Sequence, residues 1–240
     1  MRSIKSIVKL FDNGSVCVCG LRGRGKDMLF ANVIARRKKF DYVSNIDYGY
    51  GFHPYQYDDY DIGNTYENFV SGDIKPYVYP FPYGTDLYLS DCGIFFPSQY
   101  DKELDKKYKS LPCFLALSRH LGRSNVHINS QSLERVWKKI REQSDTYLMC
   151  NKCVYIKPFR LVIQTVTLYE KYESACNNVH PCRLRKPLFC SASARLNYRM
   201  YLDNFENQHG KIKRFTVIYF NKSKYDTHHF ETLLRGDLNA

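Results

Sequence analysis

The residues with the clearest chemistry lie in a glycine-rich stretch near the start of the chain. Gly20 and Gly25 bracket four residues ahead of Lys26, which gives the pattern GxxxxGK after the apolar run Val16–Cys19. Glycines in this pattern let backbone N–H groups and a helix N-terminus point at a phosphate, and the lysine neutralises the β/γ charge. The spacing predicts a phosphate-binding loop. The residues expected at the nucleotide are Gly20, Arg22, Gly23, Arg24, Gly25, Lys26, Asp27 and Met28.

The residue after the lysine departs from the usual pattern of such loops. Asp27 stands where Ser or Thr normally supplies a hydroxyl to Mg²⁺. A carboxylate at this position can hold the metal directly, or it can repel the nucleotide. The residue type leaves both outcomes open.

A second acidic position follows a predicted strand. Leu87 and Leu89 alternate toward Asp91, which stands where phosphate-loop ATPases hold Mg²⁺ through water. The alternative is a turn aspartate that caps the next segment. Asp27 and Asp91 are therefore the expected Mg²⁺ ligands. Cys92 occupies the place of the usual catalytic glutamate, and a thiol is a poor base for positioning water.

Composition limits the architecture and the partners. A chain of 240 residues with 44% apolar content can bury one main core, with or without a small appendage. The absence of a long apolar run predicts a soluble, intracellular protein, in which most of the nine cysteines are reduced. The net charge of +12 favours polyanionic partners such as nucleic acid or an anionic membrane face.

Apolar periodicity predicts the elements that must position these residues. Residues 4–11 are expected to form a lead-in strand or extended arm. Helices are expected over residues 28–35 and 111–121, and from Ser132 onward with Leu133, Val136, Trp137 and Ile140 inward. Further strands are expected over residues 42–46, 126–129, 147–150, 154–156, 159–169 and 214–220. The tyrosine-rich stretch 48–83 reads as irregular, and it serves either to stack on single-stranded bases or to pack loops on the sheet.

Several cysteines have a spacing that suits a metal. Cys150 and Cys153 form a CxxC pair, followed by Cys176, His180 and Cys182. Two soft ligands on a turn, met by a second Cys/His group, can close a tetrahedral Zn²⁺ site. The predicted zinc set is Cys150, Cys153, Cys176 and Cys182. The alternative is that these are unligated cysteines in hairpins.

Three segments in a fixed order carry a family resemblance. The sequence GLRGRGKD, then LYLSDCG, then SRHLGRSNVHINSQ is similar to the zonular occludens toxin-like (Zot-like) ATPases, filamentous-phage assembly proteins in the FtsK–HerA branch of P-loop NTPases. The resemblance covers most of the chain. It implies an α/β fold with a RecA-like, mainly parallel sheet in the order 5-1-4-3-2 and β-rich additions. Residues 1–150 would form the ATPase core, and residues 151–240 a β-rich continuation packed on it.

The resemblance also implies roles for particular residues. Lys26 would bind the β/γ-phosphates, Asp91 the metal, and Gln131 the γ-phosphate or attacking water. Arg119, which pairs with His120, would reach a neighbouring subunit of a homo-oligomeric ring, with Arg123 as a second candidate for this role. Either arginine could instead cap its helix or bind a carboxylate. The YDTHHF segment at residues 225–230 resembles one that often closes the ATPase portion.

These roles lead to an expected function. The resemblance implies a motor that binds ATP and Mg²⁺, hydrolyses the nucleotide, and drives phage DNA export and virion assembly. Single-stranded phage DNA and coat or assembly proteins would be its partners in the host cytoplasm, at the inner face of the membrane, with membrane contact only through a partner protein. The alternatives are a non-hydrolysing nucleotide-binding scaffold that recruits DNA or coat proteins, and a viral genome-packaging ATPase. The residues do not separate export from packaging.

Overall fold

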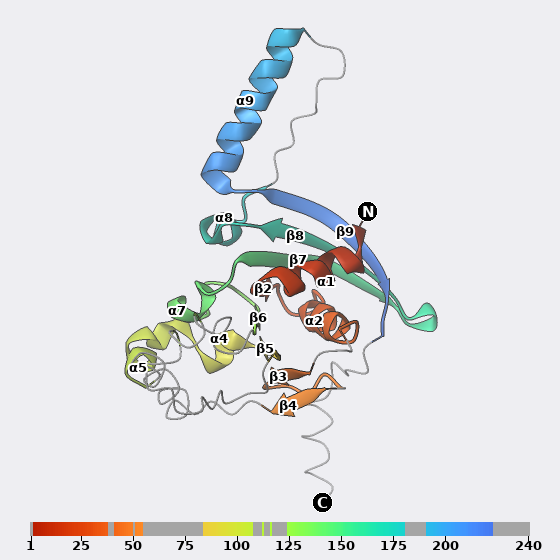
Figure 1. Ribbon diagram of the computed structural model, residues 1–240, viewed down its shortest axis with the longest axis vertical. Coiled ribbons are helices and arrows are strands. Elements are labelled where there is room, and N and C mark those ends of the chain that lie inside the picture. Colours follow the sequence, from red (N-terminus) through yellow and green to blue (C-terminus); the bar gives the residue numbers. More distant parts are fainter. Residues whose placement is uncertain are drawn as a thin grey trace, which may run out of the picture.

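A single mixed sheet organises the chain. The computed structural model describes residues 2–37, 41–49, 51–54, 84–107, 112, 116, 124–180 and 191–222. Within these residues the sheet has nine strands in the order β1-β9-β8-β7-β2-β6-β5-β3-β4 (Figure 1). The strands are β1 (Arg2–Ser3), β2 (Val16–Cys19), β3 (Tyr42–Ser44), β4 (Phe52–Pro54), β5 (Asp86–Leu89), β6 (Val126–Ser130), β7 (Thr146–Ile156), β8 (Leu161–Tyr169) and β9 (Ile212–Phe220).

The centre of the sheet is parallel. Strands β7, β2, β6, β5 and β3 are neighbours in this order, and every pairing among them is parallel. Numbered along the chain from β2, these five strands give the order 5-1-4-3-2. The predicted RecA-like order is therefore confirmed. Strand β4 extends the sheet beyond β3, again in parallel.

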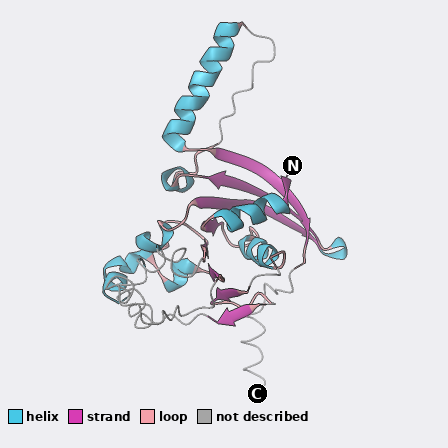
Figure 2. Ribbon diagram, viewed as in Figure 1, coloured by secondary structure: helices cyan, strands magenta, loops and turns pink. Residues whose placement is uncertain are grey.

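The other side of the sheet is an antiparallel extension. Strand β8 pairs antiparallel with both β7 and β9, and β1 runs parallel to β9 at the edge. The sequence predicted two strands where β7 is one, because a bulge between Cys150 and Lys152 interrupts the alternation without ending the strand. Strand β7 passes through residue 150, and β8 and β9 continue the same sheet. Figure 2 shows these long strands beside the helical part of the fold.

The helices are mostly short. They are α1 (Ile4–Asn13), α2 (Lys26–Ile34), α4 (Cys92–Phe95), α5 (Asp101–Lys107), α7 (Lys138–Arg141), α8 (Tyr172–Cys176) and α9 (Ala192–His209), with 3₁₀ turns η1 (Ser98–Tyr100) and η2 (Lys157–Phe159). The strand or arm predicted for residues 4–11 is wrong. This segment is α1, capped by the Ser3 hydroxyl, which accepts from the Lys5 amide at 3.3 Å. Its buried residues Ile4, Ile7 and Phe11 recur at helical spacing.

The helix predicted from Ser132 is also shorter than expected. Only α7 is helical in this stretch, although Leu133, Val136, Trp137 and Ile140 are all buried as predicted. The backbone before α7 finds partners outside a helix. The Trp137 amide donates to the Phe96 carbonyl at 2.7 Å, and Val136 forms an isolated bridge with Pro97. Apolar spacing correctly predicted which residues are buried, but nonlocal hydrogen bonds set the backbone conformation.

Both faces of the central sheet are covered. Along β2, Cys17 and Cys19 join one buried cluster, and Val16 and Val18 join the other, as the two-residue period of a strand requires. Helices α1 and α2 supply the second cluster, and they lie together against the sheet in Figure 1. Burial on both faces explains why β2 is apolar throughout.

Helix α9 has a different character. It contains 18 residues, none of them buried, and it projects away from the sheet in Figure 1. The sequence predictions did not include it. In the part of the chain that the structure describes, no helix combines the length and apolarity needed to cross a membrane. Some predicted features lie outside the described residues, namely most of the helix expected over residues 111–121, with Arg119 and His120, and also Arg123, Cys182, residues 225–230 and most of residues 48–83.

Candidate phosphate-binding site

The glycine loop joins the end of β2 to the start of α2. Gly23 and Gly25 have φ angles of +78° and +77°, a region in which side chains are strained. Gly25 is the N-cap of α2, and its carbonyl accepts from the Leu29 amide at 2.9 Å. The first-turn N–H groups of the helix are thereby left free to face a ligand, which is the arrangement that binds phosphate. The predicted contact residues Gly20, Arg22, Gly23, Arg24, Gly25, Lys26, Asp27 and Met28 all lie on this loop and the first turn of α2.

The loop also packs closely against β7. A Cβ atom on Gly20 would lie 2.9 Å from the Cβ of Cys150, and one on Gly25 would lie 2.6 Å from the Sγ of Cys153. Both distances are shorter than real Cβ contacts allow. Close packing therefore requires glycine at both positions, and at Gly25 the left-handed backbone conformation requires it as well.

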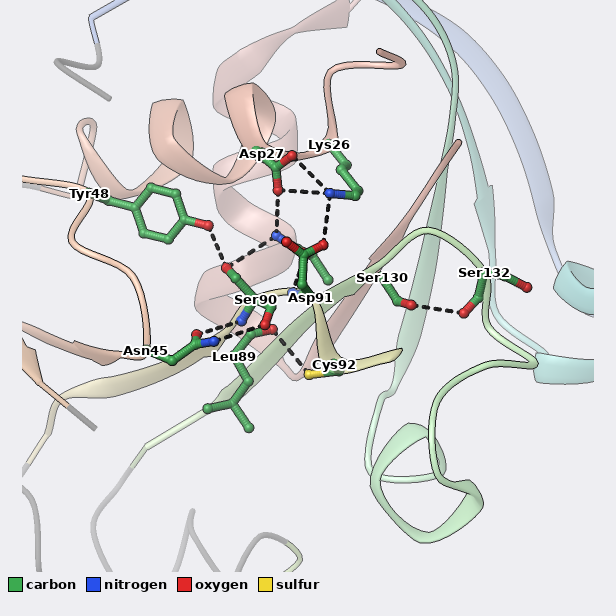
Figure 3. A network of polar contacts seen from close by, with 11 residues as sticks. Lys26, Asp27, Asn45, Tyr48, Leu89, Ser90, Asp91, Cys92, Ser130 and Ser132 are labelled. Carbon is green, nitrogen blue, oxygen red and sulfur yellow. Dashed lines mark hydrogen bonds and ion pairs between the residues drawn. The ribbon is translucent and has the colours of Figure 1, made fainter. Parts of the chain in front are cut away.

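Lys26 lies between the two predicted metal ligands (Figure 3). Its Nζ donates to Asp27 at 2.8 and 3.0 Å and to Asp91 at 3.1 Å. Burial lowers the pKa of Lys26, but the carboxylates of Asp27 and Asp91 outweigh this effect and the pKa is raised. The lysine is therefore a cation held by two carboxylates. Its side chain is only 7% exposed, whereas the two aspartates are 27% and 26% exposed.

Asn129, at the end of β6, ties the two acids together. Its side-chain amide donates to Asp27 at 3.1 Å and to Ser90 at 3.2 Å, and its carbonyl oxygen accepts from the Asp91 amide at 2.8 Å. Ser90 in turn hydrogen-bonds Tyr48. The sequence predictions did not include Asn129 in the site, although a polar residue at the end of a buried strand beside the loop was an available signal.

The backbone at Asp91 is unusual, and the residue after it faces away. Asp91 has a φ of +51°, a conformation that is strained for a residue with a side chain. Cys92 is buried, and its thiol donates to the Leu89 carbonyl at 3.2 Å (Figure 3). Burial raises the pKa of the Cys92 thiol. Cys92 therefore has neither the exposure nor the acidity to activate water, in agreement with the sequence argument.

Two cavities adjoin the site. One of about 220 Å³ is lined by Asp91, Gly93, Ile94, Ser130, Gln131 and Arg135. The other, of about 400 Å³, lies between the loop residues Gly20, Leu21 and Arg24, the middle of β7 and the end of α8. Gln131 lines both cavities, so the structure brings it to the same edge as Asp91. Arg135 is an exposed cation that lines the same cavity as Asp91, and the sequence predictions missed it because nothing in its local sequence distinguishes it.

The donor set at Asp27 and Asp91 suits a hard cation. Both carboxylates are partly exposed, and both already form an ion pair with the Lys26 ammonium group. Carboxylate oxygens beside a phosphate site are the ligands that Mg²⁺ prefers. The residues therefore fit Mg²⁺ bound together with a phosphate.

The predicted zinc residues are arranged differently. Cys150 and Cys153 lie on β7 beneath the loop, whereas Cys176 ends α8. Within the described ranges, no three His, Cys, Asp or Glu side chains gather as metal ligands. The three described members of the zinc set therefore do not come together, and Cys182 lies outside these ranges.

The strand order and the loop together define a class. Five parallel strands in the order 5-1-4-3-2, a glycine loop between the first strand and its helix, and an aspartate after the third strand make up the RecA-like P-loop NTPase fold. No family model matches the chain, and no curated protein matches it in sequence.

The chain is similar in fold to a number of solved structures. The chain is similar to the N-terminal domain of zonular occludens toxin from Neisseria meningitidis, with 12% identity, a TM-score of 0.44, and coverage of 91% of this chain and 97% of that one. The genome packaging NTPase B204 from Sulfolobus turreted icosahedral virus 2, in complex with ATP-gammaS, shows 15% identity and a TM-score of 0.39 over 57% of this chain and 73% of that one. EssC (ATPases 2 and 3) from Geobacillus thermodenitrificans shows 10% identity and a TM-score of 0.38 over 58% and 32%.

Proposed function

We propose that this chain binds ATP with Mg²⁺ at the glycine loop and hydrolyses it to drive phage DNA export and virion assembly. The observation that carries nucleotide binding is the position of Lys26. Its Nζ lies at the N-terminus of α2, within 3.1 Å of both Asp27 and Asp91. A buried cation, two partly exposed acids and a helix N-terminus at one edge of the sheet complement a triphosphate and its metal.

The present ion pairs indicate how the residues change partners. Lys26 would leave the carboxylates and donate to the β/γ-phosphate oxygens, while Asp27 and Asp91 would turn to the metal. Bound Mg²⁺ would neutralise part of the phosphate charge. Asn129 would keep both acids oriented during this exchange, because it contacts the Asp27 side chain and the Asp91 amide. Gln131, at the cavity that Asp91 also lines, would contact the γ-phosphate or orient water.

The same site favours a second candidate, a scaffold that binds nucleotide without turnover. The observation behind it is Cys92, whose buried thiol donates to the Leu89 carbonyl and cannot serve as a base. Turnover in the motor would then depend on Gln131 and on an arginine such as Arg119 supplied by a neighbouring subunit in a ring. A scaffold would need neither group.

The proposed partners follow from charge and resemblance. A net charge of +12 favours a polyanion, and we propose single-stranded phage DNA, with coat or assembly proteins as further partners. We place the protein in the host cytoplasm, at the inner face of the membrane, with a partner protein as the anchor. Packaging of DNA into preformed capsids is the alternative for the same core.

ATP turnover with and without DNA tests these proposals. We expect hydrolysis that requires Mg²⁺ and increases with single-stranded DNA, and a Lys26→Ala variant provides the background rate. Tight ATP binding without turnover, with or without DNA, would support the scaffold instead. Stimulation by duplex DNA only would favour packaging. Absence of ATP binding to the wild type would contradict the nucleotide site itself.

A further inference from the structure

A buried glutamine from the antiparallel extension contacts the glycine loop. Gln164 lies on β8 and is fully buried. Its side-chain nitrogen donates to the backbone carbonyls of Arg24 and Gly25, each at 3.1 Å, and lies 3.3 Å from the Sγ of Cys150. Its side-chain oxygen accepts from the Tyr219 hydroxyl on β9 at 2.9 Å. Strand β8 therefore contacts the loop directly, and β9 is linked to it through Gln164.

These contacts fix the direction of the loop amides. The Arg24 carbonyl belongs to the same peptide unit as the Gly25 N–H, and the Gly25 carbonyl to the same unit as the Lys26 N–H. The described residues contain no cis peptide bond, and in a planar trans unit the C=O and N–H point in opposite directions. Because Gln164 holds both carbonyls, the N–H groups of Gly25 and Lys26 must point to the opposite side of the loop. Successive N–H groups aimed the same way are what binds a phosphate.

We propose that Gln164, oriented by Tyr219, is a positioning residue that pre-forms the phosphate cradle for the β-phosphate of the nucleotide. This inference rests on the proposed nucleotide site and assigns a role to β8 and β9 within it. The role needs a side chain that donates twice from one atom and accepts at the other, and a primary amide meets this requirement. A leucine would leave two buried carbonyls without this donor, and a glutamate would place oxygen against oxygen.

Tyr219 is suited to orient the amide. Burial raises the pKa of Tyr219 well above its usual value, so its hydroxyl stays protonated and remains a donor. The Arg36 guanidinium lies 5.5 Å from the centre of the Tyr219 ring. With the tyrosine donating to the oxygen of Gln164, the amide cannot flip, and its nitrogen stays directed at the loop.

Two variants and one control test the role. Gln164→Glu removes the donors with little change of shape, and Tyr219→Phe removes only the hydroxyl that orients them. Thr167→Val is the control, because Thr167 is also buried on β8 but its hydroxyl accepts from Asn151 at 2.8 Å. Affinities for Mg·ATP and for inorganic pyrophosphate are measured by calorimetry, and thermal unfolding of each variant is recorded. In ligand-free protein, amide hydrogen exchange is followed over residues 20–30.

We expect Gln164→Glu to weaken both ligands roughly tenfold or more, and Tyr219→Phe to weaken them by about two- to fivefold. Amides of the loop should exchange faster in both variants without ligand. Thr167→Val should lower thermal stability while leaving affinity and loop exchange unchanged, which separates positioning from a general loss of packing. If Gln164→Glu does not fold, Tyr219→Phe supplies the same comparison.

The outcomes separate the two proposals. The positioning role is overturned if Gln164→Glu has the same ligand affinity and the same loop exchange as Thr167→Val. If Gln164→Glu does not fold, the same comparison is made with Tyr219→Phe. If the wild type binds neither Mg·ATP nor pyrophosphate, the proposed function fails. In that case the exchange measurement still decides whether Gln164 orders the loop.

Discussion

Two clusters of charged residues lie at opposite ends of strand β5, and they differ in how far their acids are exposed and paired within the protein. Asp86 begins β5 and pairs with Arg37 and His127, whereas Asp91 follows the other end of β5 and pairs with Lys26. The Asp86 side chain is 7% exposed and that of Asp91 is 26% exposed. In open α/β sheets, ligands bind outside the carboxyl ends of the strands. The cluster around Asp86 is closed, because its acid is satisfied within the protein. The cluster around Asp91 is open, because its acid remains accessible to a ligand.

The closed cluster is satisfied from several directions. Asp86 accepts from the Asn125 amide at 2.8 Å and from the Arg37 guanidinium, which also pairs with Asp12 at 2.8 Å. The Val16 amide donates to Nδ1 of His127 at 3.3 Å, while Nε2 of the same ring faces Asp86. An imidazole that accepts at Nδ1 must be neutral and carry its proton on Nε2. This cluster therefore serves the fold.

The largest expected effect is on stability at the closed end. Asp86→Ala should lower the free energy of unfolding by about 3–5 kcal/mol, because it leaves a buried guanidinium without this carboxylate. Nucleotide affinity of the folded protein should not change. Urea unfolding and calorimetry measure the two quantities, with Asp91→Ala as the matched variant at the open end. A loss of stability no larger than that of Asp91→Ala would contradict the distinction between the clusters.

Replacing Lys26, the cation of the open cluster, should lower nucleotide affinity and leave the free energy of unfolding nearly unchanged. Lys26→Ala should weaken ATP binding by roughly ten- to a hundredfold, because each hydrogen bond from a charged group contributes about 1.5–3 kcal/mol. Stability should change little, since the partners left behind are partly exposed. Calorimetric titration with Mg·ATP checks the first effect and thermal unfolding the second. Lys9→Ala, on the exposed side of α1, is the control. Equal ATP binding by Lys26→Ala and wild type would refute the loop assignment.

The closed cluster should also make stability depend on pH. Burial lowers the pKa of His127, and the neighbouring Asp86 only partly offsets this effect. A lowered folded pKa means that the unfolded chain binds the proton first, so stability is present above about pH 6.5 and is lost as the pH falls below it. The slope should approach about 1.4 kcal/mol per pH unit.

The pKa of Asp86 is lowered as well, despite its burial, through His127, Arg37 and the Asn125 amide. Its contribution is lost only at more acidic pH, below the ordinary carboxyl range. Urea unfolding between pH 5 and 7.5 therefore isolates His127. His127→Gln should flatten the curve in this range, and His53→Gln, at a partly exposed histidine, is the matched control. A wild-type curve that is already flat would rule out a buried neutral imidazole.

The smallest expected effect is on the Mg²⁺ dependence of ATP binding at the open cluster. With Asp27 and Asp91 both facing a triphosphate, ATP should bind poorly in EDTA and well with Mg²⁺. Asp27→Ser should keep Mg·ATP binding and reduce the metal dependence, whereas Asp27→Ala should lose metal-dependent binding. Calorimetry with and without Mg²⁺ measures the difference. Asp27 is not a ligand if wild type and Asp27→Ala bind ATP equally well under both conditions.

Local sequence predicted the parts of the fold that local chemistry determines. The loop spacing, β2 and the positions of Lys26 and Asp91 follow from glycines, apolar runs and strand ends. Residues 4–11 were misassigned although two helical signals were present, the spacing of Ile4, Ile7 and Phe11 and the Ser3 cap. Helix α9 gave no signal in apolar periodicity, which reports burial, because this helix buries no residue; the caps Ser191 and Gly210 were the signals available.

The missed site residues share a different cause. Asn129 and Gln164 are polar residues at the end of an apolar strand or inside one, and this position marks them as unusual without identifying the groups that they contact. Gln164 reaches the loop only because β8 lies next to β7 and β7 lies next to β2. That adjacency is a nonlocal fact, and spacing along the chain does not contain it.

The bulge in β7 has a consequence for how the loop is supported. Residues three apart on a regular strand point to opposite faces, yet Cys150 and Cys153 both lie beneath the glycine loop. Asn151 is the extra residue, because Cys150 pairs with Val166 and Lys152 with Thr165. If β7 kept Asn151 but ran without the bulge, Cys153 would turn to the opposite face and leave Gly25. The bulge thus takes up one residue, so that Cys150 and Cys153 remain on the face of the sheet that supports the nucleotide loop.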